Sequence, residues 1–525
     1  MGWMARQRRA YLFASLARSG DQAAVTHYDV SVRSDVELGN IEATAVLVLK
    51  ALVSGVAKHC FLLNSGLVLR AVAMDGVRLE VRELELADAP GLKALWVHLP
   101  RPLEEGQEVR LAFVYAGRPT GGRWAHIDEN GLRLSRRAAW YPVGAGFDTF
   151  TTRVACATRP GQVAVTDGDL VLTSQTGGQA VYVWEAREPI SGLALTSGQF
   201  VAECRTHRGV ELELYLGQKL REQAAPAMDL FCGVIDAYAS MLGEPQVRRF
   251  TAVLRRQYPG DEHLVRMVAA LAHETAHIWW GSPISVGFPD TWFHEALART
   301  MAYETVGRVL GDEARAMLVH EEIDRWAADS AIGSGQEESV LLWAKCRVPD
   351  APRPICIRAA LALRLLHYVL GDEAFFETLR RHVSLYRAKP SGLSEFVKVA
   401  ERVSGKDVDG FMRQWLGTTA AFAYEIARAR CSEKPGGGFV TRFTLVNMGD
   451  TAGAVPADVL LVGDRGVASR EKVTLTGRDQ VLMICSGHRV NAVVLDPDAY
   501  LPNRSWRNCR AELAATASTK GGTRP

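Results

Sequence analysis

The sequence lacks the features that would place the chain in a membrane or on nucleic acid. Although 48% of its residues are apolar, no stretch stays apolar for the roughly 18 residues that a membrane-spanning helix needs. An excess of one charge is also lacking, because 61 Lys and Arg residues stand against 59 Asp and Glu residues. No global field therefore attracts nucleic acid or an anionic membrane. We expect no nucleic acid partner and no membrane span, and we read the local pairs Arg136-Arg137, Arg255-Arg256 and Arg380-Arg381 as solvated charges.

Paired cysteines are lacking as well. Nine cysteines are spread along the chain without a Cys-x-x-Cys spacing. Scattered free thiols of this kind are typical of a reducing compartment. Residues 1–17 carry arginines before a short apolar run, which is only the outline of a signal peptide. We therefore expect a cytoplasmic protein.

The periodicity of the apolar residues changes twice along the 525 residues, a length too great for one hydrophobic core. From Tyr28 to about Gly217 an alternation with a period of two predicts antiparallel strands. Helical spacing follows from Leu220 to Leu416, interrupted by one strand-like run at residues 250–254. From about residue 425 the strands return, which predicts a small β-sandwich.

The predicted fold class is therefore α+β with several domains. The strands of the first domain are expected to form antiparallel sheets, and the second domain is expected to be mainly helical. The predicted division is an N-terminal tail at 1–26, a β-domain at 27–208, a mainly helical domain at 209–424, a β-sandwich at 425–510 and a disordered tail at 511–525.

The segment 271–281 contains a His-Glu-x-x-His motif within a stretch of helical character. On a helix, a spacing of four residues places His273 and His277 on one face, where both imidazoles can bind the same ion. Glu274 lies beside that face and can take a proton from a metal-bound water. Gly281 is expected to end the helix. The motif by itself also fits a helix with two hydrogen-bonded histidines and a solvated glutamate, so a third ligand decides.

The third ligand is predicted on the next helix, which covers residues 290–300. Its buried stripe contains a carboxylate, Glu295, and a buried carboxylate is costly unless it is paired or bound to a cation. Two histidines and one glutamate leave a position open for water, which is the arrangement of a catalytic zinc site. His294 is an alternative ligand, but it lies about 100° round the helix from Glu295. We predict one Zn²⁺ per chain, held by His273, His277 and Glu295.

These residues resemble the gluzincin aminopeptidase family, which contains aminopeptidase N and leukotriene A hydrolase. The resemblance rests on the His-Glu-x-x-His motif, on Trp279-Trp280-Gly281 and on the Trp-x-x-Glu pattern from Trp292 to Glu295. Weaker similarities at 28–30, 140–142, 359–376 and 411–416 extend it over most of residues 27–420. The resemblance implies a saddle-shaped β-domain followed by a thermolysin-like zinc domain.

The sequence departs from the family at three points. One residue fewer than in the family separates His277 from Glu295. The family's Gly-x-Met-Glu-Asn strand, whose Glu binds the free amino terminus of the substrate, has no counterpart at residues 250–260. We read Asp261 and Glu262, which follow this run, as helix-cap charges.

The third departure concerns the oxyanion of the tetrahedral intermediate. The family's tyrosine that supports it aligns with Cys356, just before a helix expected to begin at Arg358. Cys356 is therefore a candidate oxyanion-side position, with a zinc ligand, a nucleophile and a buried thiol as alternatives. Tyr368 and Tyr386 could replace the tyrosine only if the fold brings them to the site.

The predicted function is that of a zinc-dependent metallohydrolase that cleaves a peptide or amide bond by metal-activated water, with Glu274 as the catalytic base. The substrate is expected to be a peptide or a small molecule. Two alternatives stay open, namely a zinc-binding pseudo-peptidase that acts as a partner-binding protein and a specialised hydrolase of a small metabolite or an epoxide. The sequence assigns no oligomeric state.

Overall fold

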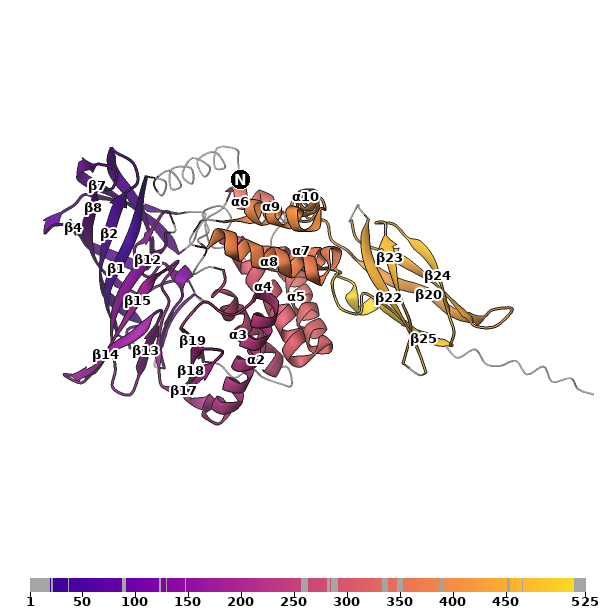
Figure 1. Cartoon of the computed structure of the whole chain (residues 1–525). Helices are drawn as coiled ribbons and strands as arrows, with labels where there is room; N and C mark the ends of the chain where they lie inside the picture. The colour runs from indigo at the N-terminus through magenta and orange to yellow at the C-terminus, as the bar shows by residue number, and fades with distance from the viewer. Residues whose placement is uncertain are drawn as a thin grey trace, which may run out of the picture.

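The computed structural model shows strands, then helices, then strands, in the order that the periodicity predicts (Figure 1). It confirms the α+β fold class. Among the residues that the structure describes, no helix is long and apolar enough to cross a membrane. The structure describes residues 19, 22–35, 37–86, 91–121, 124–128, 130–146, 148–255, 263–280, 284, 291–332, 339–346, 353–387, 389, 391–450, 454–464 and 466–513.

The N-terminal block consists of three sheets. An eight-stranded sheet has the order β14-β15-β12-β1-β2-β8-β4-β5, and two four-stranded sheets have the orders β13-β16-β10-β9 and β11-β3-β7-β6. The strands are β1 Ala23–Asp35, β2 Asn40–Ala51, β3 Val56–Asn64, β4 Leu67–Met74, β5 Val77–Arg78, β6 Val81–Glu85, β7 Leu92–Leu103, β8 Glu108–Gly117, β9 Ala125–Asp128, β10 Gly131–Leu134, β11 Val143–Gly144, β12 Phe150–Thr158, β13 Val163–Thr166, β14 Asp169–Thr176, β15 Gln179–Ile190 and β16 Leu195–Gly198.

The large sheet is antiparallel except at its centre. The β1–β2 pair is antiparallel, with Tyr28 opposite Leu47, and both side chains are buried. The β1–β12 pair is parallel, with Tyr28 opposite Thr152. Parallel neighbours need a long crossover, and here about a hundred residues separate the two strands. Short-range alternation cannot predict such a pair.

A three-stranded sheet joins the strands to the helices. β18 Val210–Gly217 lies between β17 Phe200–His207 and β19 Arg249–Leu254, and it pairs with β19 in parallel. β19 is the strand predicted at 250–254. The chain then reaches the helix that carries the histidines, so this sheet sets where that helix begins.

The helical block covers the residues predicted to be helical. α3 packs against α4, and α4 packs against α7. Figure 1 shows these helices between the N-terminal strands and the C-terminal strands. The helices are α2 Ala224–Leu242, α3 His263–Ala276, α4 Thr291–Leu310, α5 Asp312–Ile332, α6 Val340–Cys346, α7 Arg353–Leu370, α8 Asp372–Tyr386, α9 Leu393–Ser404 and α10 Val408–Leu416.

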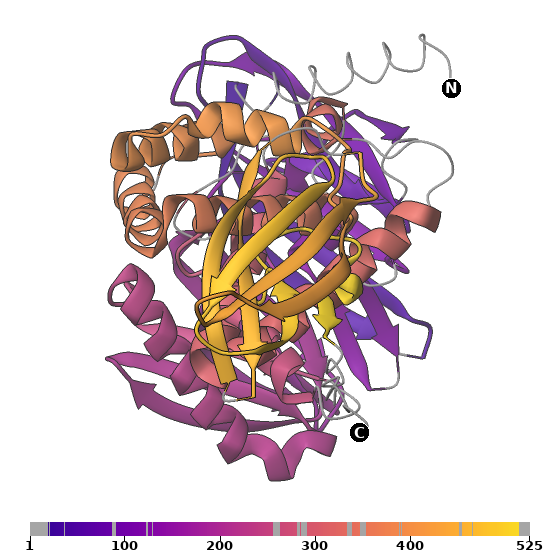
Figure 2. The same cartoon turned by 90° about the vertical axis from the view of Figure 1, so that its right-hand side faces the viewer.

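The C-terminal block has two small sheets, β20-β21-β24 and β23-β22-β25-β26. Figure 2 shows them in front of the helices when the molecule is viewed from the C-terminal end. The apolar core of these sheets is continuous with that of the helical block. The predicted boundaries at residues 208 and 424 stay predictions. The strands are β20 Tyr424–Glu433, β21 Phe439–Asn447, β22 Val455–Gly463, β23 Gly466–Leu475, β24 Gln480–Ser486, β25 Val490–Leu495 and β26 Arg510–Glu512.

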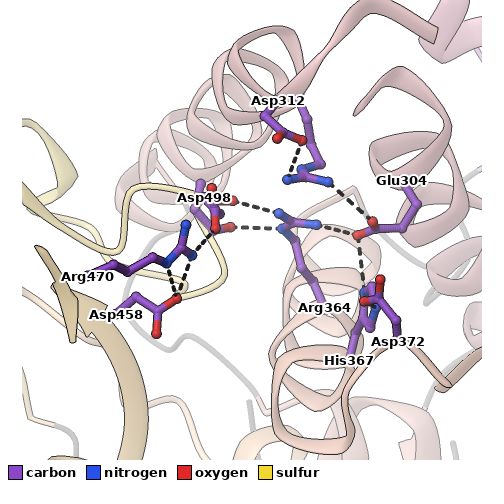
Figure 3. A network of polar contacts seen from close by, with 10 residues as sticks. Glu304, Asp312, Arg364, His367, Asp372, Asp458, Arg470 and Asp498 are labelled. Atoms are coloured by element: carbon purple, nitrogen blue, oxygen red, sulfur yellow. Dashed lines mark hydrogen bonds and ion pairs between the residues drawn. The ribbon is translucent and has the colours of Figure 1, made fainter. Parts of the chain in front are cut away.

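A buried polar network fastens the C-terminal block to α7 (Figure 3). The Arg364 guanidinium is fully buried and donates to the carbonyl oxygens of Asp498, at 2.6 Å, and Ala499, at 2.8 Å. It also pairs with Glu304 of α4. Glu304 in turn lies 3.3 Å from Nδ1 of His367. One charged group of α7 thus holds a helix on one side and the C-terminal loop on the other.

Candidate metal centre

The end of α3 places both histidines of the motif. His273 lies in the last turn of α3, while α3 ends at Ala276, so that His277 follows the regular helix. The predicted end at Gly281, which lies outside the described residues, is therefore too late. The backbone N–H of His277 donates to the carbonyl of Glu274 at 3.2 Å, a tighter turn than that of an α-helix. This tightening keeps the second imidazole close to the first.

The protonation state of His277 is set by the backbone. Its Nδ1 lies 3.0 Å from the carbonyl oxygen of Trp280, so Nδ1 carries the proton and Nε2 keeps a free lone pair. The indole of Trp280 donates to Nδ1 of His382 at 3.2 Å, and Nε2 of His382 lies 2.7 Å from the Ser391 hydroxyl. Burial lowers the pKa of His277 and brings that of His382 to about 4. Both rings are therefore neutral near pH 7.

Glu295 meets the two imidazoles from α4. Its neighbours Trp292, Phe293 and Ala296 are buried against the core, which fixes this face of the helix. The Glu295 carboxylate lies 3.4 Å from Nε2 of His273 and 3.6 Å from Nε2 of His277. The structure thus brings together the three residues that the sequence predicts as ligands.

The donor set fits zinc. The three ligand atoms of His273, His277 and Glu295 lie within 4.8 Å of one another. Tetrahedral ligands at zinc-ligand distances of about 2.0 to 2.1 Å stand roughly 3.4 Å apart, close to the measured separations. Two imidazole nitrogens and one carboxylate also leave the open position that a catalytic site requires. The three side chains are 14 to 22% exposed, so the centre is reachable from solvent.

Glu274 stands beside this group. It follows His273 directly on α3, and its side chain is exposed whereas those of Leu271 and Thr275 are buried. A carboxylate that is exposed next to a metal-binding group can exchange protons with water. The structure thus leaves the Glu274 side chain exposed to solvent, directly after the ligand candidate His273.

The alternative ligand His294 faces elsewhere. It is 5% exposed, and burial lowers its pKa well below the ordinary value, with His382 and His277 adding to this effect. Its Nε2 has no hydrogen-bond partner in the described part of the chain. The metal-binding group that the described residues form does not include His294.

Three candidates for the missing family residues lie in the described part of the chain, and the role of Cys356 on the oxyanion side stays a prediction. Cys356 lies inside α7, which begins at Arg353 and not at Arg358, and its thiol is 2% exposed. The Tyr368 hydroxyl donates to Asp458 at 2.5 Å, and Tyr386 packs on His382. Asp261, Glu262 and the shortened loop lie outside the described residues.

Arg136 is a charged neighbour of the centre that the sequence reading missed. It belongs to the short helix η1 (Arg136–Ala138) of the N-terminal block. Burial opposes its charge, but the carboxylates of Asp167 and Glu274 outweigh burial and raise the pKa of Arg136. Glu295 acts in the same direction. The Arg136 side chain is 34% exposed and pairs with Asp167 at 3.2 Å, so it is a partly buried, ion-paired charge.

Comparison with known proteins gives the same family as the resemblance. The model of the "Peptidase family M1 domain" matches residues 247–415. The "Probable aminopeptidase 2" of Sulfurisphaera tokodaii is 23% identical over 179 residues, which is 32% of this chain and 22% of that protein. Aminopeptidase N of Lactococcus lactis subsp. lactis is 26% identical over 164 residues, 29% of this chain and 18% of that protein. The chain thus matches about a fifth of the length of these curated relatives.

Solved structures share the fold over a larger part of the chain. The M1 zinc metallopeptidase from Deinococcus radiodurans has a TM-score of 0.59 and 19% identity, covering 75% of this chain and 94% of its own. A substituted form of that protein, bound to a Tyr-Ser-Ala substrate, has a TM-score of 0.54 and 18% identity over the same shares. The arrangement of β-domain and helical domain is therefore shared with these structures.

Proposed function

We propose that the chain is a zinc-dependent peptidase, which is supported by the match of the "Peptidase family M1 domain" to residues 247–415. The zinc ligands are His273, His277 and Glu295, and Glu274 is the catalytic base. The observation that carries this proposal is the convergence of two imidazoles and one carboxylate within 4.8 Å, with an exposed glutamate beside them.

The chemistry follows from the positions of the side chains. Zinc, when bound, polarises the amide carbonyl and makes water a stronger acid. The Glu274 carboxylate takes the proton of the attacking water and then passes it to the nitrogen of the leaving amine. The Trp280 carbonyl keeps the His277 proton on Nδ1, so that Nε2 stays available as a ligand.

A peptide is the proposed substrate. The Deinococcus relative with the shared fold is described with a Tyr-Ser-Ala substrate, and the chemistry of the donor set suits an amide carbonyl. We also propose a cytoplasmic location, which is supported by the free state of the eight cysteines that the structure describes.

The test compares the wild type with Glu274→Gln in zinc content and turnover. Both proteins are expected to bind one zinc, because Glu274 is not a ligand. Turnover of aminoacyl anilides and short peptides should fall by at least about a hundredfold in the variant, the usual effect of losing a general base. Zinc content is measured by inductively coupled plasma mass spectrometry. The substrate panel also includes N-blocked peptides and an epoxide.

The outcomes separate the alternatives left open by the sequence. A wild type that holds zinc but turns over nothing on the panel indicates a partner-binding pseudo-peptidase. Turnover of the epoxide alone indicates a specialised hydrolase. A wild type that holds no zinc after growth with zinc contradicts the metal centre itself.

A further inference from the structure

The sheet β20-β21-β24 of the C-terminal block has an open edge at β24. β24 pairs with β21 in one unbroken register, from Gln480 opposite Leu445 to Ser486 opposite Phe439. In the part of the chain that the structure describes, no strand is hydrogen-bonded to the other side of β24. The backbone N–H and C=O groups on that side are therefore available to another extended segment.

The other edge strands of the two C-terminal sheets are protected against such pairing, whereas β24 is not. β20 carries charged residues and a bulge between Ala427 and Arg430, and β23 and β26 also carry charged residues. Charges and bulges on an edge strand discourage the addition of a further strand. β24 contains neither a charged residue nor a proline, and its Val481 and Met483 side chains are 55% and 66% exposed. An apolar and unbroken edge of this kind favours strand addition.

The outer face of the same sheet carries a pair of arginines. Arg430 of β20 lies directly opposite Arg442 of β21, and Arg442 lies directly opposite Met483 of β24. Both arginines are exposed, and neither forms an ion pair with a described residue. Glu425, the acidic residue on this face of β20, accepts a hydrogen bond from Asn508 at 2.8 Å instead. Like charges opposite each other destabilise a sheet, so an anion bound here would relieve the repulsion.

Lys434 brings a third positive charge to the edge strand itself. It lies at the tip of the β20–β21 hairpin, where its backbone N–H donates to the Gly438 carbonyl at 2.9 Å. Its Nζ lies 3.5 Å from Sγ of the exposed Cys485 in β24, and no described carboxylate pairs with it. Neighbouring strands stand about 4.8 Å apart, so Arg442 is about 10 Å from a strand added beside β24. Arginine and glutamate side chains together cover that distance.

The composition of this surface indicates what kind of molecule fits it. On the outer face of β20, β21 and β24, the described residues include no aromatic side chain on which a nucleic acid base could stack. A second copy of the chain would bring the same cations and would be repelled. An extended protein segment with alternating carboxylates and apolar side chains matches both the charges and the free backbone groups.

We propose that the free edge of β24 binds an extended acidic segment of a partner protein as an added strand. The backbone of this segment completes the hydrogen bonds of the open edge. Its carboxylates pair with Lys434 at one end of β24 and with Arg442 beyond Met483. This surface belongs to a different block from the metal centre, so the inference goes beyond the proposed function and does not depend on it.

The test compares two peptide probes that differ only in charge. One is a fluorescein-labelled peptide of alternating Glu and Val, blocked at both ends, and the matched probe has Gln in place of each Glu. Fluorescence anisotropy measures their binding to the full chain, and mass spectrometry checks that they stay intact. The acidic probe should bind at least about tenfold more tightly than the glutamine probe. Lys434→Gln combined with Arg442→Gln should weaken the binding of the acidic probe at least about tenfold and leave that of the glutamine probe unchanged.

Substitutions of Met483 test the position of the binding surface. Met483→Glu should weaken the binding of the acidic probe and Met483→Lys should not, whereas a general loss of folding would affect both variants. Arg510→Gln is the matched control and should leave the affinity unchanged, since Arg510 of β26 is 55% exposed and pairs with Glu512 at 2.7 Å. Hydrogen exchange followed by mass spectrometry should show slower exchange of the β24 amides when the acidic probe is bound.

Three results of these measurements would overturn the inference. They are equal affinities for the two probes, an affinity that the Lys434 and Arg442 substitutions do not change, and bound acidic probe that leaves the exchange of β24 unchanged. A single-stranded oligonucleotide that binds more tightly and displaces the acidic probe would identify a nucleic acid surface instead. A dimer in sedimentation that Met483→Lys dissociates would identify a second copy as the occupant, which likewise contradicts an acidic partner.

Discussion

At the scale of single residues, the orientation of His277 depends on a chain of contacts that ends at Ser391. The chain runs from the imidazole through the Trp280 carbonyl, and from the Trp280 indole to His382. Loss of a group that hydrogen-bonds a metal ligand and orients it typically lowers metal affinity by about 10- to 100-fold.

We therefore expect Trp280→Phe to weaken zinc binding by about tenfold. The substitution leaves Nδ1 of the buried His382 without its donor and frees the Trp280 segment to move. Affinity is measured by competition with a chelator. Trp279→Phe is the matched control, since Trp279 is also buried but stacks on Tyr238, with ring centroids 5.1 Å apart. Equal affinities in the two variants would contradict the positioning role of the indole.

The ligand residues could be predicted from the sequence, whereas Arg136 could not. His273, Glu274 and His277 lie within five residues, and a helix converts that spacing into one face. Glu295 could be predicted because it places a charged side chain within an otherwise apolar helix face. Arg136 is more than a hundred residues from α3. The residues around it resemble an ordinary polar turn, so the sequence does not single it out. Its relation to the centre exists only after the two blocks have packed together.

At the scale of elements, the pairing of α4 with α7 depends on a buried ion pair (Figure 3). The Arg364 side chain is 0% exposed and Glu304 is 4% exposed. Despite burial, which raises the pKa of Glu304, the charge of Arg364 and the contact with His367 lower it to about 2. Glu304 is therefore ionised in the folded protein.

Glu304→Gln should destabilise the helical block by about 3 to 5 kcal/mol, since it leaves a buried guanidinium without its counter-charge. Chemical denaturation followed by circular dichroism measures the loss. Asp312→Asn is the control, because Asp312 is 73% exposed and pairs with Arg315 at 2.8 Å. That surface pair should contribute less than about 1 kcal/mol. Similar losses in both variants would contradict the role of the buried pair.

The same variant should change the dependence of stability on pH. A carboxyl whose pKa falls from 4.5 when free to about 2 in the folded protein stabilises fully above pH 4.5, and this contribution is lost as the pH falls toward 2. The wild type should therefore lose about 2 kcal/mol more than Glu304→Gln between pH 6 and pH 3. The pKa of His367 is raised above its ordinary value of 6.5. The folded protein therefore keeps this imidazole protonated from pH 6 to pH 3, so the comparison reports mainly on Glu304.

The order of the elements could be predicted, but some of their limits could not. The change of period marks the helical block from α2 to α10. The start of α7 was expected at Arg358, but it lies at Arg353 because Pro354 is compatible with the first turn of a helix. This difference matters for function, since it moves Cys356 into the helix and buries it.

At the scale of the whole molecule, the hydrophobic core has two main parts. One part lies within the N-terminal strands, from Ala23 to Leu195. The other runs without interruption from Val210 through the helices to Cys509 in the C-terminal block. The β-sandwich domain predicted at 425–510 stays a prediction, because it rests on the periodicity of strands that resumes there. Periodicity reports the type of an element and carries no information about which elements share a core.

We expect the helical and C-terminal blocks to unfold together and the N-terminal block to unfold separately. Hydrogen exchange followed by mass spectrometry measures the opening free energies of α7, of β22 in the C-terminal block and of β2 in the N-terminal block. Glu304→Gln should lower those of α7 and β22 by the same amount and leave that of β2 unchanged, because Arg364 binds both α4 and the Asp498 carbonyl. Asp312→Asn should change none of them by more than about 1 kcal/mol. If β22 opens at a lower free energy than α7 and does not respond to the Glu304 substitution, the C-terminal sheets fold on their own and the shared core does not couple them to the helices.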